Sequence, residues 1–386
     1  AWTVVTVSLI PDYGGEETIQ LVWTTDANPQ REPQVNWFNR LYPDYRLRID
    51  PDNSGVMKVV VQCSAGMGPD LIGGISRNTI ETYVSAGIVW DVTEIADDMG
   101  FGVETLPEPV RPLVQYRDPK TFEMRQWCYP ANVANRILIY NKDLFDEAGV
   151  AYPPKDLTWK QYIDLAQRMT FYESETSEVP TVFGGAGVSY EPLLWGMGGA
   201  FFNEEGTRCL FGEEPAIRAA KFLHDLYYVH RVEPSPTQEA GVTGQGGWGG
   251  GHFFSWFADG RLAMYVGSRW NLIQIRRFFT EMQKTEADWE RENPGQPYEG
   301  ATPPRMGAAF IPRFEGAPRY THLTARSVGV NKMSDHREHA AFFLQYLAGP
   351  KYSELINVGA DAMPGNEAVI SREQFYHPER PGEQEI

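Results

Sequence analysis

An arginine and a tryptophan follow an alternating apolar run in the stretch GRLAMYVGSRW, residues 260–270. The run predicts a strand, and Gly267 and Ser268 let the chain turn tightly at its end. Arg269 carries several planar N–H donors, and Trp270 carries a flat apolar face. Together they suit a ring-shaped, hydroxyl-rich ligand, which needs an aromatic cover and paired hydrogen bonds. The alternative is that Trp270 only packs beneath the helix that follows.

Alternating strands and helices must position such loops. Residues 17–74 contain, in order, a strand, an amphipathic helix, a strand, a helix and a third strand. This order predicts a mostly parallel sheet covered by helices, and therefore an α/β fold. Further along, the patterns predict a strand at 136–140 and helices at 158–173, 215–232 and 335–357, the first of them capped by Thr158. In open α/β sheets, ligands bind beyond the carboxyl ends of the strands, where the loops converge.

Length and charge restrict the class of protein. A chain of 386 residues exceeds a typical single core, so two lobes are expected. The net charge of −17 argues against nucleic acid and anionic membranes as partners, because both call for clustered Lys and Arg. The acidity suits a soluble protein outside the cytoplasm, and the start at Ala1 is what a processed or truncated export protein would look like.

The sequence shows no motif of a catalytic, metal or cofactor centre. It has no GxSxG elbow, no P-loop, no HExxH and no paired CxxC. Its cysteines, Cys63, Cys128 and Cys209, are too few and too scattered for a disulfide scaffold or a zinc site. We therefore expect neither a cofactor nor a metal.

The order of several short motifs resembles a known family. The motifs are GMGPDLIGG, LIYNKDLFDEAGV, TWKQYIDLAQRM, LLWGMGGAFF, FADGRLAMYVGSRW, MGAAFIPRF and VGVNKMSDHREHAAFFLQYLAG. This succession, over roughly residues 17–365, resembles the family 1 extracellular solute-binding proteins, the sugar-capturing subunits of bacterial ABC importers, to which the maltodextrin-binding proteins belong. No single motif is decisive, and their order and spacing carry the resemblance.

The resemblance implies a two-lobed, type II periplasmic-binding-protein fold with a ligand cleft between the lobes. Each lobe would hold a mixed, mostly parallel sheet flanked by helices. The implied crossovers lie near residues 129–135, 311–313 and 359–364. Lobe one would then hold residues 1–130 and about 313–360, and lobe two about 136–310 and 361–386. Relatives usually continue several tens of residues past the third crossover, often with an aromatic cleft residue, whereas this sequence ends at Ile386. Either the tail is shortened or a piece is missing, so the resemblance does not extend to a C-terminal aromatic platform.

The resemblance also implies a set of ligand-binding residues. Trp270 matches the position of a sugar platform, and Tyr190 and Glu191 match an acid and a tyrosine that meet the sugar. The alternative for these two is a cap on their own helix. Trp195, one turn further on, is expected in the core. The full set of candidates is Thr25, Asp26, Asn28, Gly74, Ser76, Arg77, Asn132, Asn135, Tyr190, Glu191, Trp248, Ser268, Arg269, Trp270, Thr324 and Arg326.

Local alternatives apply to several of these candidates. Asp26 or Asn28 either contacts the ligand or caps the helix that opens near Pro29. Trp248, in the glycine-rich stretch 241–251, either reaches over the ligand or is an ordinary loop tryptophan. The loop with Gly74 lacks the aromatic residue that relatives often have there, which suggests a ligand other than a maltodextrin.

Three functions are consistent with these residues. The preferred one is a binding protein that captures a neutral mono- or oligosaccharide by hinge closure and delivers it to an ABC permease. It would act as a monomer, in the periplasm or lipid-anchored at the outer face of the cell membrane. The second keeps the fold but binds an anionic ligand, a uronic acid or glycerol phosphate, because Arg77, Arg269 and Arg326 suit such groups. The third is a glycoside hydrolase with Asp26 and Glu191 as its two carboxylates, although the eightfold βα repetition is missing.

Overall fold

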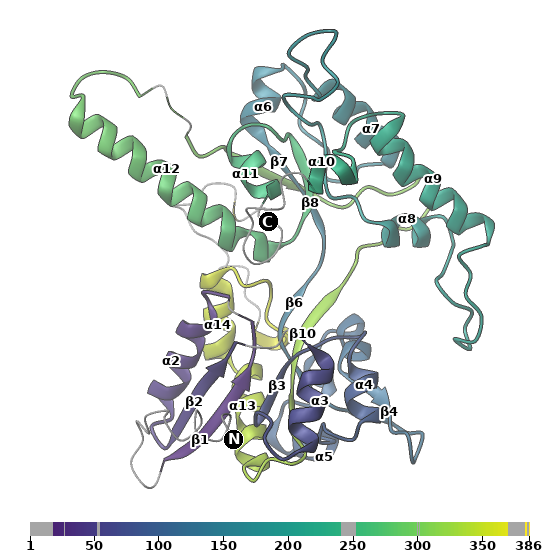
Figure 1. The fold of residues 1–386 in the computed structure, drawn as a ribbon, viewed down its shortest axis with the longest axis vertical. Helices are drawn as coiled ribbons and strands as arrows, with labels where there is room; N and C mark the ends of the chain where they lie inside the picture. The colour runs from purple at the N-terminus through teal and green to yellow at the C-terminus, as the bar shows by residue number, and fades with distance from the viewer. Residues whose placement is uncertain are drawn as a thin grey trace. The chain divides into compact units, whose positions relative to one another are not determined.

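Two compact units make up the chain (Figure 1). The computed structural model describes residues 18–26, 28–51, 55–240, 252–298, 300, 302–369, 383 and 386. Unit 1 contains Ala1–Val133, Thr324–Gly359 and Met363–Ile370, and unit 2 contains Ala134–Leu323, Ala360–Ala362 and Ser371–Ile386.

Unit 1 is built on a five-stranded sheet with the strand order β2-β1-β3-β10-β6. Strand β1 runs parallel to β2 and β3, and β10 runs antiparallel to β3. Strands β4 and β5 of this unit pair with each other in a separate antiparallel hairpin. The elements of this unit are β1 (Ile19–Thr24), α2 (Arg31–Leu41), β2 (Tyr45–Asp50), α3 (Val56–Ser64), β3 (Leu71–Ile75), α4 (Ile80–Ser85), α5 (Thr93–Met99), η1 (Val103–Thr105), η2 (Glu108–Leu113), β4 (Gln115–Arg117), β5 (Met124–Gln126), β6 (Tyr129–Ala134), β10 (Thr324–Val330), α13 (Arg337–Ala348), α14 (Pro350–Gly359) and η5 (Glu367–Val369).

Buried aromatic rings join the helices of unit 1 to its sheet. Phe38 of α2 lies 5.2 Å from Phe343 and 5.1 Å from Tyr346, both on α13, measured between ring centroids. Trp23 of β1 lies 5.2 Å from the same Phe343. Strands β1 and β3 approach so closely that a Cβ on Gly73 would meet the carbonyl oxygen of Thr24 at 2.0 Å. Glycine is required there because the neighbouring backbone occupies the space of a side chain.

Unit 2 is built on a three-stranded sheet with the order β8-β7-β9. Its middle strand β7 is antiparallel to both neighbours, so the named strands of this unit do not form the mostly parallel sheet that the sequence suggested. Strand β7 starts at the edge of the sheet where β8 and β9 end, so it runs in the opposite direction to both. The elements are β7 (Ile137–Asn141), α6 (Lys142–Glu147), α7 (Trp159–Arg168), α8 (Tyr190–Gly196), α9 (Glu214–Tyr228), α10 (Pro236–Ala240), α11 (His252–Ala258), β8 (Met264–Gly267), η4 (Arg269–Asn271), α12 (Leu272–Glu292) and β9 (Met306–Ala309).

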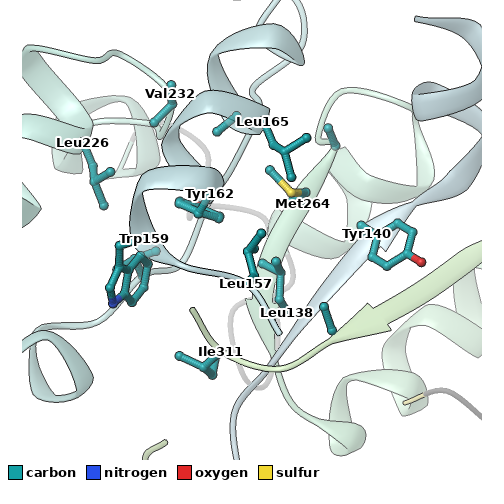
Figure 2. Packing of buried hydrophobic residues seen from close by; sticks show 14 of the residues in the cluster. Leu138, Tyr140, Leu157, Trp159, Tyr162, Leu165, Leu226, Val232, Met264 and Ile311 are labelled. Atoms are coloured by element: carbon teal, nitrogen blue, oxygen red, sulfur yellow. The ribbon is translucent and has the colours of Figure 1, made fainter. Parts of the chain in front are cut away.

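The larger core of unit 2 gathers side chains from strands and helices (Figure 2). Leu138 of β7 and Met264 of β8 meet Tyr162 and Leu165 of α7 there. Helix α7 begins where expected, because the Thr158 hydroxyl accepts from the Gln161 backbone N–H and the Gln161 side chain accepts from the Thr158 N–H.

The second boundary between the units lies about ten residues later than expected. The sequence suggested a crossover at 311–313, whereas unit 2 extends to Leu323. Ile311 is buried in the core of unit 2. The Arg313 N–H donates to the Leu157 carbonyl at 3.0 Å, and the Trp159 N–H donates to the Arg313 carbonyl at 3.0 Å. These bonds hold the chain after β9 on unit 2.

Candidate ligand-binding edges of the two units

One edge of the unit 1 sheet collects three of the predicted loops. Strands β1 and β3 are parallel, so both end at this edge, and β10 starts there because Ser327 pairs with Ile75 at the end of β3. The loop after β1, the loop after β3 and the first residues of β10 therefore lie together. They carry the candidates Thr25, Asp26, Asn28, Gly74, Ser76, Arg77, Thr324 and Arg326.

Asp26 is the centre of a charged cluster at this edge. Its Oδ1 atom lies 2.8 Å from Arg31 Nε, and its Oδ2 atom lies 2.9 Å from Arg326 Nη1. The carboxylate and Arg31 are buried, whereas the side chain of Arg326 keeps 33% of its exposure. Arg31 also donates to Gln34 at 2.9 Å and lies 5.8 Å from the centre of the Trp23 ring. The cluster thus offers both donors and acceptors, with Arg326 as its accessible member.

Other candidates of unit 1 make local backbone contacts. Asn28 Oδ1 accepts from the Gln30 N–H at 2.9 Å, in the turn that leads into α2. Helix α2 has Gln30 as its N-cap and no side-chain capping bond, so Asn28 holds the preceding turn and does not cap the helix. The Ser76 N–H donates to Thr79 Oγ1 at 2.9 Å, just before α4. Thr25 is buried, and its hydroxyl donates to Asp26 at 3.3 Å.

The remaining candidates of unit 1 differ in accessibility. Gly74 has a φ of 72°, a value that favours glycine, and Arg77 is exposed. Thr324 is exposed at the first position of β10. Asn132 is 95% buried within β6, so its amide is less accessible than the side chains of Arg77 and Thr324.

Unit 2 has a corresponding edge. Ile137, at the start of β7, pairs with Gly267 at the end of β8, and Leu138 pairs with Ala309 at the end of β9. The segment before α8 follows β8 in the same direction, with the Val266 N–H donating to the Ala186 carbonyl at 2.9 Å. The loops at this edge contain Asn135, Tyr190, Glu191, Ser268, Arg269 and Trp270.

The stretch after β8 forms a short helical turn that leads into α12. The Ser268 N–H donates to Asn271 Oδ1 at 2.6 Å, which fixes the turn. Arg269 is buried, and this burial together with the nearby Arg276 lowers the pKa of its guanidinium to about 10, while Glu383 acts in the opposite direction. Trp270 is half-buried, and its ring lies edge-on to Phe254 at 6.3 Å.

Tyr190 and Glu191 open helix α8 at the same edge. The Tyr190 hydroxyl donates to the Ala216 carbonyl at 2.9 Å, and its ring stacks on Phe211 at 5.8 Å. Tyr190 therefore joins α8 to α9, and burial raises the pKa of its hydroxyl. Glu191 is half-buried. Burial of Arg136 lowers the pKa of its guanidinium, and the electrostatic interaction with Glu191 opposes this effect.

Sequence reasoning missed two members of these edges. Arg31 and Arg136 were not among the candidates, although each lies within five positions of one. Trp195 packs against the core of unit 2, as expected, and its half-buried ring also lies 6.1 Å from the His322 ring and 6.5 Å from the Tyr320 ring. No local pattern brings Trp195 and His322 together, because they are far apart in the sequence.

Three further observations complete the description of the candidate residues. Trp248 lies outside the described residues, so its predicted role stays a prediction. Within the ranges that the structure describes, no group of three or more His, Cys, Asp or Glu side chains is arranged to hold a metal ion. Among the helices in those ranges, none is long and apolar enough to cross a membrane.

The sequence matches the model of the bacterial extracellular solute-binding protein family over residues 16–354. The chain therefore belongs to this family, whose members are binding proteins rather than enzymes. The resemblance read from the order of motifs is confirmed.

Individual relatives are more distant. The chain is 26% identical over 232 residues to the arabinooligosaccharide-binding protein of Halalkalibacterium halodurans, an alignment that spans 59% of this chain and 44% of that protein. It is 23% identical over 268 residues to the diacetylchitobiose-binding protein DasA of Streptomyces coelicolor, spanning 67% of this chain and 56% of that protein.

Solved structures share the fold. An ABC substrate-binding protein of Listeria monocytogenes in complex with cycloalternan superimposes with a TM-score of 0.72 at 21% identity, over 96% of this chain and 86% of that one. Maltose-bound MalE3 of T. maritima gives 0.67 at 19% identity, over 93% and 84%. The fold is therefore that of the type II periplasmic binding proteins, as predicted.

Proposed function

We propose that this protein captures a neutral mono- or oligosaccharide outside the cytoplasm and delivers it to the membrane permease of an ABC importer. Family membership supports the class of function, and the family description supports the location. Relatives named for arabinooligosaccharide and diacetylchitobiose, and structures holding cycloalternan and maltose, support carbohydrate as the class of ligand. We further propose that the protein acts as a monomer and has no catalytic activity of its own.

The pairing of arginines with acids carries the choice of a neutral ligand. Arg326 lies against Asp26, and Arg136 interacts electrostatically with Glu191. An anionic ligand would compete with these carboxylates for the guanidinium groups, whereas a sugar can use both partners at once. Each hydroxyl donates one hydrogen bond and accepts others, so a paired acid and arginine match vicinal hydroxyls.

The aromatic candidate completes this chemistry. Trp270 is half-buried beside Arg269, at the edge where β8 ends. A pyranose ring has an apolar face that an indole can cover, and such contacts contribute beyond the area buried. We therefore assign Trp270 as the platform and Asp26, Arg326, Glu191 and Arg269 as the polar contacts.

The test is a thermal-shift and calorimetric screen with matched neutral and anionic compounds. The panel contains arabinotriose, chitobiose, maltose and galactose, with galacturonate and glycerol 3-phosphate as the anions. A neutral saccharide should raise the unfolding midpoint in proportion to the logarithm of its concentration. Trp270→Ala should weaken that binding at least about tenfold, the loss expected for a stacking contact that contributes about 1.4 kcal/mol.

A second tryptophan provides the matched control. Trp37 on α2 is half-buried and lies against Arg40, at 5.4 Å from its guanidinium carbon to the ring centre, within unit 1. Trp37→Ala should leave the affinity within about twofold, because Trp37 lies on a helix and at neither sheet edge. Binding of galacturonate or glycerol 3-phosphate alone would contradict the neutral-sugar proposal and support the anionic alternative.

A further inference from the structure

A buried ion pair joins the start of α12 to residue 383. Glu383 Oε1 lies 2.9 Å from Arg276 Nε, and Glu383 Oε2 lies 2.6 Å from Arg276 Nη2. The two groups form a bidentate contact, with 3% of the Glu383 side chain and 16% of the Arg276 side chain exposed. Bidentate pairs between arginine and carboxylate fix geometry as well as charge. The pair bridges 107 positions of the sequence.

Arg276 is linked to the candidate ligand-binding stretch by its position on the helix. Arg269 lies in the turn η4, which continues directly into α12, seven positions before Arg276. Arg276 and Glu383 also act electrostatically on the Arg269 guanidinium: Arg276 lowers its pKa and Glu383 raises it. Two buried guanidinium groups repel one another, and a carboxylate beside them offsets that repulsion.

Apolar packing connects residue 386 to the neighbouring Trp270. Ile386 packs against the same buried apolar cluster as Trp270, a cluster that includes Phe254, Tyr265 and Leu272. Residues 383 and 386 therefore contact the supports of both members of the Arg269–Trp270 pair, one through charge and one through apolar packing.

We infer that Glu383 and Ile386 position the Ser268–Arg276 segment, so that residues far along the chain set the geometry of Arg269 and Trp270. Glu383 acts through Arg276 and is a positioning residue rather than a ligand contact. Its importance for ligand binding rests on the proposed function, whereas its action on the segment does not. The candidate ligand-binding residues read from the sequence include none beyond Arg326.

The experiment is hydrogen exchange on the ligand-free full chain. Glu383→Gln removes the charge that pairs with Arg276 and leaves a buried guanidinium without that carboxylate. The amides of Ser268, which donates to Asn271 Oδ1, and of Asn271, which donates to the Ser268 carbonyl at 2.9 Å, should exchange at least about tenfold faster. Amides of β1 in unit 1 should be unchanged.

Glu214→Gln is the matched control. It also removes an acid from an arginine pair of unit 2, since Glu214 Oε1 lies 3.3 Å from Arg218 Nη1. That pair is exposed and lies within helix α9. The control should therefore leave the Ser268 and Asn271 amides within about twofold of the wild type.

Two more variants separate positioning from a general loss of stability. Glu383→Asp keeps the charge and should restore most of the protection, and Ile386→Ala should give a smaller increase in exchange at the same amides. The inference is overturned if Glu383→Gln folds and leaves exchange at Ser268 and Asn271 unchanged, or if it raises exchange equally throughout unit 2. If Glu383→Gln fails to fold, Ile386→Ala and Glu383→Asp decide by the same criterion.

The affinity for a neutral saccharide, measured on the same variants, tests the link to binding. Glu383→Gln should weaken it at least fivefold by displacing Arg269. Absence of any sugar binding to the wild type would refute the proposed function, while the exchange result would still decide the positioning role.

Discussion

Glu233 should make the protein less stable as the pH rises from about 4.5 to about 7. Its side chain is 98% buried, with Oε1 accepting from the Tyr162 hydroxyl at 2.6 Å and Oε2 from the Val188 N–H at 3.3 Å. Burial raises the pKa of this carboxyl from 4.5 to about 7, because removal from water penalises the charged form more than the two hydrogen bonds favour it.

The sign and size of the effect follow from proton linkage. Between the two pKa values the unfolded chain releases the proton of Glu233 while the folded protein retains it, so the free energy of unfolding falls with rising pH. The contribution of the protonated Glu233 to the free energy of unfolding is complete below about pH 4.5 and is lost by about pH 7. A shift of about 2.5 units corresponds to about 3 kcal/mol at 1.36 kcal/mol per unit.

The assay is urea unfolding of the wild type and of Glu233→Gln at several pH values from 4.5 to 7.5. The amide cannot ionise, so the wild type should lose about 3 kcal/mol relative to the variant across this range. Glu178→Gln, an exposed acid in the same unit, is the control and should follow the wild type. A difference between wild type and Glu233→Gln that varies by less than about 1 kcal/mol would refute the reasoning.

Three further predictions concern stability and thiol chemistry. Asp26→Ala removes the carboxylate between two arginines and should lower the free energy of unfolding by about 3 kcal/mol in urea titrations; a loss below about 1 kcal/mol would contradict the importance of this cluster. Gly73→Ala places a Cβ against the backbone of β1 and should cost about 3 kcal/mol or prevent folding, measured by circular dichroism, and wild-type melting would show that the strands can separate. Ellman's reagent at pH 8 should label only the exposed Cys209 in the folded protein, because burial raises the thiol pKa of Cys63 to about 11 and of Cys128 to about 12; fast labelling of three thiols would contradict this.

Several elements could be predicted because their signals are local. The strand that ends near Trp23, the helix after it and the cap at Thr158 follow from neighbouring residues, and the structure has β1, α2 and α7 there. The stretch that ends in Arg269 and Trp270 follows β8, as its alternating pattern predicted. The order of short motifs also sufficed to identify the family, which the match over residues 16–354 confirms.

The contacts of the candidate residues could not be predicted in the same way. The pairing of Asp26 with Arg326 depends on β10 returning antiparallel beside β3, a register that no local pattern contains. The opposite case is Asn28, whose contact with the Gln30 N–H is local, although it is not the helix cap that the sequence offered as an alternative. The assignment of candidates to ligand contacts stays a prediction.

The sequence by itself determined the class of protein and the positions of most strands and helices, because periodicity, caps and turns act over a few residues. The tertiary structure decided which acids neutralise which arginines and where unit 2 ends in the chain. It joined Arg276 to Glu383 and kept Ile311 in the core of unit 2. Such partners are chosen by strand order and by the burial of charge, and both depend on residues that meet only when the chain has folded.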